Sequence, residues 1–439
     1  MTRLSSSLAS AAAAAALYSS GVSAQKLVFA HVVVGDTASH NQSTWENDIK
    51  LASAAAIDAF ALNGGYPDSN IPIQVANAFA ACEALDNGFK LFFSFDYLGG
   101  GQPWPATGDN SVASYLANYT KSSCYQNYNN LPFVSTFEGT KNIDDWAPGG
   151  SIRSAAGDVY FVPDWTSLGT SGITAHLDNI EGFFSWNMWP DGANNLTDDG
   201  DKAWQSAIGS KSYMMGVSPW FFHSGSSSGT NWVWRGDDLW ADRWQEVFDV
   251  DPQFVEIVTW NDWGEASYIG PFVSDNEVPT TSAPYVDNMP HESFRDFLPY
   301  YIATFKGSNF TISKDQMQYW YRLAPAAGGS ACGVDGNDPD QGQTEVDPNT
   351  IVQDKVFFSA LLTSAATVQV QIGSNSPTQF DGSQGLNHFS QPFNGQTGEV
   401  TFSIIRNGET VGNGTGAAIT SSTSLSNGCT NYNAWAGSF

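Results

Sequence analysis

The chain has few basic residues and few charged residues of any kind. Among its 439 residues, 17 Lys and Arg stand against 44 Asp and Glu, which gives a formal net charge of −27 at pH 7. A protein that binds nucleic acid, or is held on anionic lipid by basic residues, needs excess positive charge. Both classes are excluded, and we expect neither nucleic acid nor membrane among the partners.

Long apolar runs and cysteine are also scarce. After residue 24, no stretch of eighteen uncharged apolar residues predicts a membrane-spanning helix. The four cysteines show no CxxC or other metal-ligand spacing, so we expect disulfides and no metal site. Pairing within sequence neighbourhoods joins Cys82 to Cys124 and Cys332 to Cys429.

The N-terminus has the features of an export signal. Arg3 is followed by a Ser/Ala-rich apolar run that ends in Val22-Ser23-Ala24, the small-x-small form of a cleavage site. We therefore interpret residues 1–24 as a signal peptide and expect a secreted, extracellular protein, with the cell wall as one possible location. Five Asn-x-Ser/Thr sequons agree with export and predict surface glycans at Asn41, Asn118, Asn195, Asn309 and Asn413.

Aromatic residues, in contrast, are abundant. They make up 14% of the chain and include 16 Trp, so there is ample apolar surface for folded cores. Up to about residue 322, apolar runs of strand length alternate with segments of helical spacing. The runs are apolar on both alternations, as in a parallel sheet covered on both faces. They span residues 27–34, 56–62, 89–95, 131–137, 159–162, 182–186, 212–217 and 254–259.

Eight strand–helix units in about 300 residues predict a (β/α)8 TIM barrel over residues 25–324. The predicted helices include residues 44–55, 73–85, 112–124, 237–248 and 292–306. A doubly wound open sheet is the alternative. It usually carries a glycine-rich phosphate turn after its first strand, and Val34-Gly35-Asp36-Thr37 lacks the further glycines.

The composition changes after the predicted barrel. Residues 325–350 are rich in Ala, Gly and acidic residues, and we interpret them as a linker with a solvated loop. Asp335, Asn337 and Asp338 resemble part of a calcium loop, but Pro339 stands where that motif needs a ligand. Residues 351–439 contain short alternating segments with Gly, Asn and Ser turns, which predict a small β-sandwich domain packed on the barrel.

Polar and tryptophan residues close the predicted barrel strands. In TIM barrels the active site lies at the carboxyl ends of the strands, so these side chains are the candidate site residues. Taken singly, an Asp or Asn there is more often a turn or cap residue. We predict that the following converge on one mouth: His31, Asn63, Asp96, Glu138, Asp164, Trp165, Trp186, Asn187, Trp220, Asp237, Trp260, Asn261, Asp262 and Glu265.

The candidate residues combine carboxylates, indole faces and amides, and they include no Ser/His pair, metal cluster or phosphate loop. This combination indicates a sugar site. Glycosidic cleavage needs one protonated carboxyl and one ionised carboxylate. Carboxylates crowded in a partly dry cleft repel one another, so one of them keeps its proton near neutral pH. Strand eight is the densest source, because Asp262 and Glu265 are separated only by Trp-Gly, and Gly264 would permit a sharp turn.

At these residues the sequence resembles glycoside hydrolase family 71, the fungal alpha-1,3-glucanases or mutanases. The likeness covers the barrel and extends toward the C-terminal β domain. One departure is Val32, where the family resemblance leads us to expect an aromatic residue after His31. The matching stretches are residues 28–31, 60–63, 92–96, 135–139, 184–189 and 259–265.

The resemblance implies endo-type hydrolysis of alpha-1,3-glucan with inversion at the anomeric carbon and no cofactor. It implies that Asp262 and Glu265 are the catalytic pair; we assign Glu265 as general acid and Asp262 as base, although the sequence does not fix their order. Asp96, Glu138 and Asp164 become sugar ligands or charges that raise the pKa of the acid. The alternatives are a barrel glycosidase for another glucan and a non-catalytic wall lectin. We expect a monomer.

Overall fold

The computed structural model describes residues 25–224, 231–273, 277–326, 333–338, 342–421, 425 and 429–439. Eight parallel strands form a barrel that closes through pairing of β3 with β5, so the predicted (β/α)8 barrel is confirmed. The open-sheet alternative is excluded, because an open sheet has two unpaired edges. The barrel strands are β1 (Leu27–Val33), β2 (Ala59–Gly65), β3 (Lys90–Asp96), β5 (Leu131–Phe137), β6 (Tyr160–Asp164), β7 (Gly182–Ser185), β8 (Ser212–Val217) and β11 (Phe254–Ile257).

Aromatic side chains fill the barrel interior near the amino ends of the strands. The rings of Phe29, Phe92 and Phe133 lie 4.8–5.2 Å apart, and Phe254 lies 5.1 Å from Phe133. All four side chains are buried. This layer makes the barrel a packed core with no pore, so ligands are restricted to its open ends.

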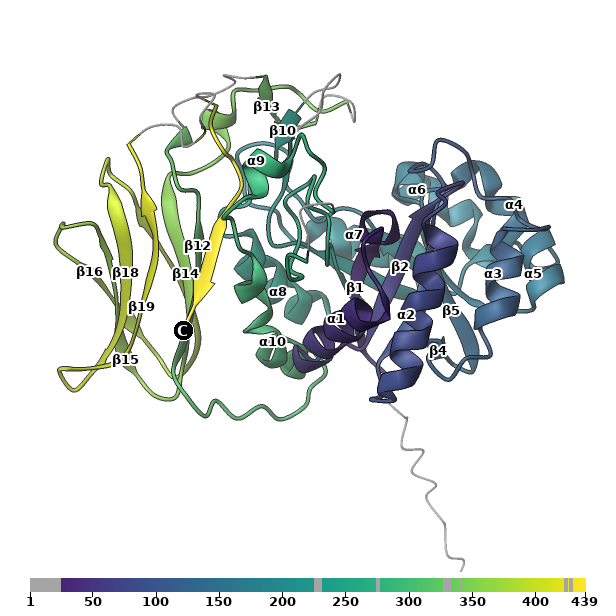
Figure 1. Cartoon of the computed structure of the whole chain (residues 1–439), viewed down its shortest axis with the longest axis horizontal. Helices are drawn as coiled ribbons and strands as arrows, with labels where there is room; N and C mark the ends of the chain where they lie inside the picture. Colours follow the sequence, from purple (N-terminus) through teal and green to yellow (C-terminus); the bar gives the residue numbers. More distant parts are fainter. Residues whose placement is uncertain are drawn as a thin grey trace, which may run out of the picture.

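Helices cover the outside of the barrel (Figure 1). The predicted helix 292–306 is divided into a 3-10 turn (Glu292–Arg295) and the helix α10 (Leu298–Phe305). Pro299 lacks an N–H, so it suits the first turn of α10, where it lies, and not the interior of a longer helix. Between β6 and β7 there are only short helical turns, including α6. The helices are α1 (Gln42–Ala54), α2 (Ile71–Leu85), α3 (Val112–Tyr119), α4 (Ile143–Trp146), α5 (Ser151–Ala156), α6 (Gly169–Gly172), α7 (Asp199–Ile208), α8 (Leu239–Val250), α9 (Ala283–Val286) and α10 (Leu298–Phe305).

Two four-stranded antiparallel sheets form the C-terminal part (Figure 1, green to yellow). Apolar side chains from both sheets, such as Phe358 and Phe402, share one buried cluster. The inner sheet is ordered β17 (Gly385–Pro392), β14 (Lys355–Leu362), β12 (Gln316–Tyr321), β20 (Trp435–Ser438), and the outer sheet β16 (Thr378–Gly382), β15 (Ala366–Ile372), β18 (Gly398–Arg406), β19 (Glu409–Ile419).

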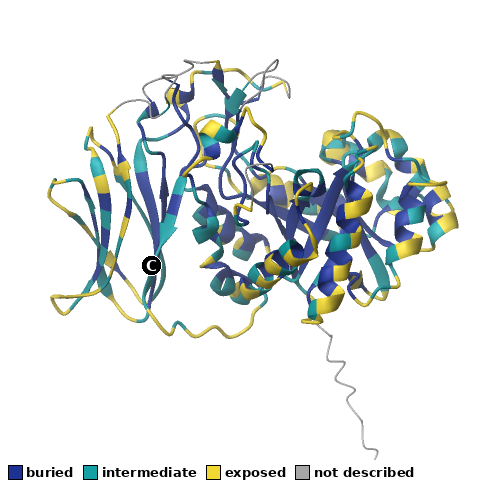
Figure 2. Cartoon of the chain, in the orientation of Figure 1, coloured by how far each residue is buried: buried dark blue, intermediate teal, exposed yellow. Residues whose placement is uncertain are grey.

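Strand β12 corrects the predicted domain boundary at residue 324. It pairs with β14 and β20, so this segment, predicted as part of the barrel, is a central strand of the inner sheet. Its side chains alternate: Tyr319 packs in the C-terminal cluster, whereas Trp320 packs in the barrel cluster. The two central strands of the inner sheet, β12 and β14, are thus buried on both faces, and most of their residues are dark in Figure 2.

The predicted linker, residues 325–350, is also more structured than expected. Strand β13 (Val334–Gly336) pairs with β10 (Asn231–Val233), which in turn pairs with β9 (Phe222–His223). Asn337 and Asp338 are buried, so the expectation of a solvated loop is wrong at these residues. The parallel partner of β13 is β10, which lies between the barrel strands β8 and β11 in the chain, and this pairing accounts for the burial.

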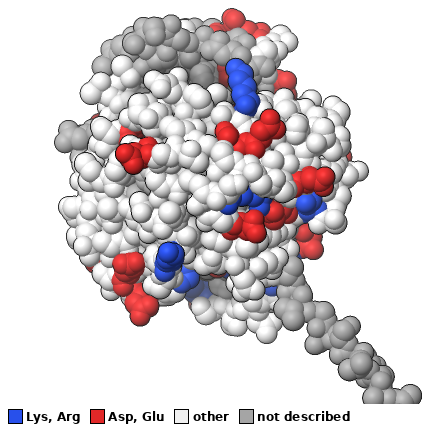
Figure 3. Space-filling view, turned by 90° about the vertical axis from the view of Figure 1, so that its right-hand side faces the viewer, with Lys and Arg blue, Asp and Glu red and all other residues white. Residues whose placement is uncertain are grey.

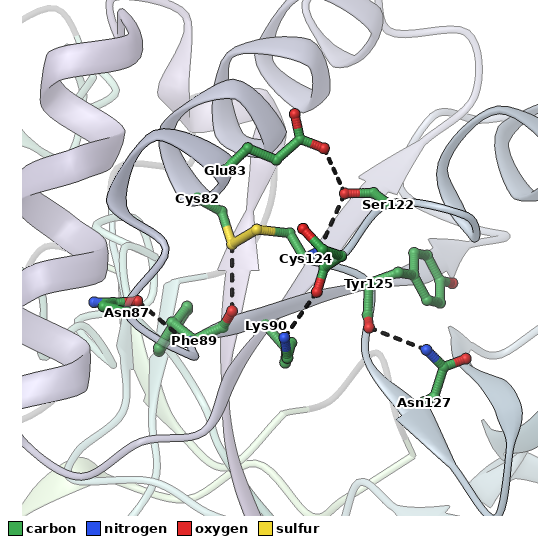
Figure 4. The surroundings of a disulfide bond; sticks show 10 residues. Cys82, Glu83, Asn87, Phe89, Lys90, Ser122, Cys124, Tyr125 and Asn127 are labelled. Carbon is green, nitrogen blue, oxygen red and sulfur yellow. Dashed lines mark hydrogen bonds between the residues drawn. A yellow bond between two sulfur atoms is a disulfide. The ribbon is translucent and has the colours of Figure 1, made fainter.

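A disulfide joins Cys82 of α2 to Cys124 after α3, as predicted (Figure 4). It closes a loop with a sequence separation of 42 residues. Replacing both cysteines with serine should lower the free energy of unfolding by about 2–5 kcal/mol, since the unfolded chain gains freedom. Urea denaturation measures this. Ser122→Ala, which removes a hydroxyl beside an intact disulfide, should change stability far less; equal losses in the two variants would contradict the prediction.

The described residues cover only some of the predictions that concern export. All five sequon asparagines are exposed. The predicted signal peptide and Cys332 lie outside the described residues, so cleavage and the Cys332–Cys429 pair stay predictions. In the part of the chain that the structure describes, no helix has the length and apolar character needed to cross a bilayer. The face in Figure 3 is mostly uncharged, with more acidic than basic groups, as the composition predicts.

Candidate active site

The turn after β11 presents Asp262 and Glu265, both half-buried. Thr259 Oγ1 accepts a hydrogen bond from the Asp262 N–H (2.8 Å), and Asp262 Oδ1 accepts one from the Glu265 N–H (2.9 Å). The left-handed residue of the turn is Ala266 (φ 54°), not Gly264. A Cβ on Gly264 would make only ordinary contacts, so the expected role of this glycine is wrong.

The Glu265 carboxyl group lies among other acids. Among the described residues no hydrogen bond or ion pair reaches its oxygens. Burial raises its pKa well above the usual value, and the negative charges of Asp262, Asp36 and Asp338 raise it further. Protonation removes this repulsion, so Glu265 is suited to hold a proton near neutral pH.

Asp262 has a different environment. Burial raises its pKa, but the Glu265 N–H and the nearby imidazole of His31 stabilise its ionised form and counteract that increase. When Glu265 is protonated, Asp262 is the carboxyl group of the pair that more readily stays ionised. The turn thus presents one carboxyl suited to donate a proton and one suited to accept a proton.

Asp36 is a site residue that the sequence analysis missed. It lies in a 3-10 turn (Val34–Thr37) directly after β1 and is half-buried. Burial raises its pKa to about 8, and the charges of Asp262, Glu277 and Asp68 add to the increase. Asp36 follows a barrel strand as Asp96 does, so the same feature of the sequence could have identified it.

His31 links the barrel interior to the mouth. Its Nδ1 lies 2.7 Å from Glu256 Oε1 of β11, and both side chains are buried. This contact ties the imidazole to the strand that precedes the Asp262–Glu265 turn. The centroids of the His31 ring and the half-buried Trp186 indole lie 5.3 Å apart, in an edge-to-face arrangement. The structure thus brings His31 and Trp186 together, as predicted.

The other side of the mouth holds Glu138 and Asp164. The two Glu138 oxygens accept hydrogen bonds from the N–H and hydroxyl of Ser167. Asp164 is fully buried, and its Oδ1 accepts hydrogen bonds from the N–H and hydroxyl of Thr166. Burial and the charge of Glu138 raise the pKa of Asp164 to about 8. Glu138 is half-exposed at the mouth, whereas Asp164 lies beneath it.

Comparison with known proteins identifies the family. The sequence profile of glycosyl hydrolase family 71 matches residues 24–439. The chain belongs to this family. It is 33% identical to a glucan endo-1,3-alpha-glucosidase of Schizosaccharomyces pombe, over 94% of this chain and 95% of that protein. A mutanase of Penicillium rubens is 30% identical, over 94% and 88%.

Several predicted sugar contacts of this family 71 chain are structural instead. Trp165, Trp220 and Trp260 are at most 2% exposed, and the Trp220 indole N–H donates to the Tyr432 carbonyl. Asn261 is also buried; its side chain bonds both the N–H and the carbonyl of Val33, which continues the pairing of β1 and β11. These four side chains have no surface for a polysaccharide.

Three further predicted contacts have local partners. Asp237 is buried and accepts from the Gln353 N–H, which fixes the inner sheet on the barrel. Asp96 Oδ1 accepts from the N–H groups of Leu98 and Gly99, a turn-forming role. Asn63 is buried beside Ser94. Of the predicted amides, only Asn187 is exposed at the mouth.

The buried acids of the family 71 barrel predict a pH-dependent stability. The pKa values of Asp36 and Asp164 are raised to about 8, and two adjacent carboxylates raise that of His40 to about 9 despite its burial. A raised folded-state pKa contributes stability below the unfolded-state value and loses it as the pH rises through the folded-state value. The melting temperature should therefore fall between about pH 6.5 and 9.

Scanning calorimetry over that pH range measures the effect. Asp164→Asn should reduce the slope, since a neutral side chain replaces one of the acids that must ionise. The buried His291, with a pKa lowered to about 4, works in the opposite direction only below its unfolded-state value of 6.5. A melting temperature that stays constant or rises from neutral to alkaline pH would contradict the prediction.

Proposed function

We propose that this chain is a secreted enzyme that cleaves alpha-1,3-glucan at internal linkages with inversion at the anomeric carbon. The names of two relatives support the substrate, since one is a glucan endo-1,3-alpha-glucosidase and the other a mutanase. A third, an ascus wall endo-1,3-alpha-glucanase of Schizosaccharomyces pombe, is 29% identical over 64% of this chain and 66% of that protein.

The observation that carries the mechanism is the contrast between the two acids of the β11 turn. Glu265 is the general acid: it gives its proton to the glycosidic oxygen as the C1–O bond breaks, and the leaving sugar departs as an alcohol. Asp262 is the general base: one oxygen is held by the Glu265 N–H, and the other takes a proton from water as that water attacks C1. The water adds from the opposite face, which inverts C1.

Side chains at the mouth supply sugar contacts. The half-buried indole of Trp186 and the exposed amide of Asn187 lie directly after β7. An indole face suits the apolar face of a pyranose ring, and an amide suits its hydroxyl groups. Glu138, half-exposed directly after β5, is a further candidate contact. The proposed chemistry needs no cofactor.

Proton NMR of the first products from insoluble alpha-1,3-glucan tests the proposal. We expect oligosaccharides whose new reducing ends appear first as the β-anomer and then mutarotate. An initial α-anomer would overturn inversion. New reducing ends from another glucan, but not from this one, would favour the alternative substrate, and binding without release would favour a lectin.

Secretion has a separate test. Expression of the full chain in a fungal host should give a culture-medium protein that begins at Gln25 and loses mass on treatment with an N-glycosidase. The exposed sequon asparagines support this expectation. A cell-retained protein that keeps residues 1–24 would contradict it.

A further inference from the structure

A cavity of about 480 Å³ lies between the segment after β11, the segment after α9 and the edge strand β20. In Figure 1, α9 is seen where the barrel meets the C-terminal sheets. The volume falls within the range of about 300–1,000 Å³ that is typical of ligand pockets. Trp263 lines the cavity, whereas Asp262 and Glu265 do not, so the cavity adjoins the catalytic turn but is separate from the mouth.

The walls of this cavity are held by hydrogen bonds between distant segments. The Tyr268 hydroxyl donates to the Met289 carbonyl (2.6 Å) and accepts from the Asn433 amide (3.1 Å). The N–H of Ala436 in β20 donates to the Pro290 carbonyl (3.0 Å). The cavity is therefore preformed, and a ligand that enters it does not have to order its walls.

One wall of the cavity is aromatic. The ring centroids of Trp263 and Tyr268 lie 4.4 Å apart, and Phe272 lies edge-to-face on Trp263 at 5.6 Å. Trp263 and Tyr268 are each only 2% exposed, whereas Phe272 is 47% exposed. A buried aromatic base thus supports one exposed ring. Such a ring presents a flat apolar face of the kind that suits a pyranose.

The opposite wall is polar and acidic. Asp287 and Asn288 are exposed, and Glu292 is half-buried. Among the described residues no hydrogen bond engages the side chain of Asp287 or Asn288, and neither Lys nor Arg lines the cavity. The free carboxylate and amide groups suit hydroxyl groups, and the negative charge disfavours an anionic ligand. The lining therefore fits a neutral, polyhydroxylated ligand.

A second cavity extends the first along α9. It has a volume of about 600 Å³, and Phe272, Val286 and Asp287 line both cavities. The exposed ring and the exposed carboxylate thus belong to both. The two cavities together form one surface groove, which we call the Phe272 groove. A groove of this kind can accept a segment of a polymer as well as a single sugar ring.

We propose that the Phe272 groove is a second glucan-binding site, which holds one chain of insoluble alpha-1,3-glucan while another chain occupies the mouth. The inference rests on the proposed function for the identity of its ligand. Its physical basis is the pairing of an exposed aromatic ring with free hydrogen-bonding groups next to the catalytic turn. Binding there keeps the enzyme on the polymer and takes no part in cleavage.

Adsorption of the full chain to insoluble alpha-1,3-glucan tests the proposal. Isotherms are measured in the Glu265→Gln background, so that the polymer stays intact, and kcat/KM on soluble alpha-1,3-gluco-oligosaccharides is measured without that change. Phe272→Ala should weaken adsorption by roughly 3–10-fold and leave kcat/KM near the wild-type value. Phe272→Trp, which keeps a flat ring, should adsorb like the wild type. Asp287→Ala should weaken adsorption by about 2–5-fold.

Phe310 offers a matched control. It is 40% exposed, lies after α10 and packs on Tyr300 at 5.7 Å, and it does not line the Phe272 groove. Phe310→Ala therefore removes an exposed ring of the same kind and should leave adsorption unchanged. Melting temperatures are measured for every variant, and Asp287→Ala carries the test alone should Phe272→Ala not fold.

Unchanged adsorption in Phe272→Ala and Asp287→Ala overturns the proposal. An equal loss in Phe310→Ala overturns it too, because that result indicates a general apolar contact with the polymer. A parallel fall of kcat/KM on the soluble substrate also overturns it, since the groove would then act only through Trp263 and the catalytic turn. Wild-type enzyme that releases no new reducing ends from the soluble substrate would overturn the proposed function instead, and adsorption would still decide whether the groove binds glucan.

Discussion

Replacing Glu265 with Gln should reduce kcat on alpha-1,3-glucan by roughly 10²–10⁴-fold while the melting temperature stays near that of the wild type. Gln has the shape of Glu but cannot give a proton to the leaving oxygen. Among the described residues no hydrogen bond depends on the Glu265 carboxyl, so the neutral amide disturbs no partner. Since Glu265 already holds its proton near neutral pH, the neutral amide leaves the charge of the site almost unchanged, and the fold should keep its stability. Release of new reducing ends measures the activity.

Asp262→Asn should cause a loss of similar size, since the amide oxygen can still accept the Glu265 N–H but the side chain can no longer take a proton from water. Asp144→Asn is a matched control, because it makes the same change at an exposed position on α4. Near-normal rates in either the Glu265 or the Asp262 variant would assign the chemistry to Glu138 or Asp164 instead.

The eight strands could be predicted because a strand that is buried on both faces consists mainly of apolar residues. Strands such as β3 are largely apolar, and several of the apolar runs end in a polar residue, as β3 does in Asp96. The β11 turn could be selected because two acids fall within four residues. Both features involve residues that are close together in the sequence, so the sequence pattern shows them directly.

Side-chain direction was not predictable in the same way. Trp165 directly follows Asp164, yet its ring packs on Phe161 inside the protein. Trp220 lies after β8, but its indole N–H finds a carbonyl more than two hundred residues later in the chain. Whether a residue at a strand end turns toward the mouth or toward the helices depends on partners that are distant in sequence.

The same limit applies to the segment after the barrel. A composition rich in Gly and Asp is typical of a solvated loop, and no pattern in residues 333–338 announces a strand. Strand β13 exists because β10 offers it a parallel edge, and β10 is separated from it by about a hundred residues. The burial of Asp338 follows from that pairing and not from its own sequence neighbourhood.

A chain that ends at Asp315 should fail to form a cooperatively folded barrel, although all eight barrel strands remain. Without β12 and β14 the barrel loses the buried side chains of Trp320, Phe357 and Leu361, which belong to its own apolar cluster. Burial of such side chains stabilises a fold by about 1.5–3 kcal/mol each. The total is comparable to the whole stability of a domain, about 5–15 kcal/mol.

Polar groups at this junction would lose their partners at the same time. The Trp220 indole N–H bonds the Tyr432 carbonyl, and the buried His291 ring bonds the Ala434 carbonyl through Nε2. An unpaired buried polar group costs about 1–3 kcal/mol. Near-UV circular dichroism and a thermal melt measure the outcome. Trp220→Phe in the full chain, which removes only one of these bonds and keeps an aromatic ring, should lower the melting temperature but leave one sharp transition. A truncated monomer with a native-like spectrum and its own sharp transition would mean that the barrel folds independently, and the inner sheet would then be an accessory to the enzyme and not part of its core.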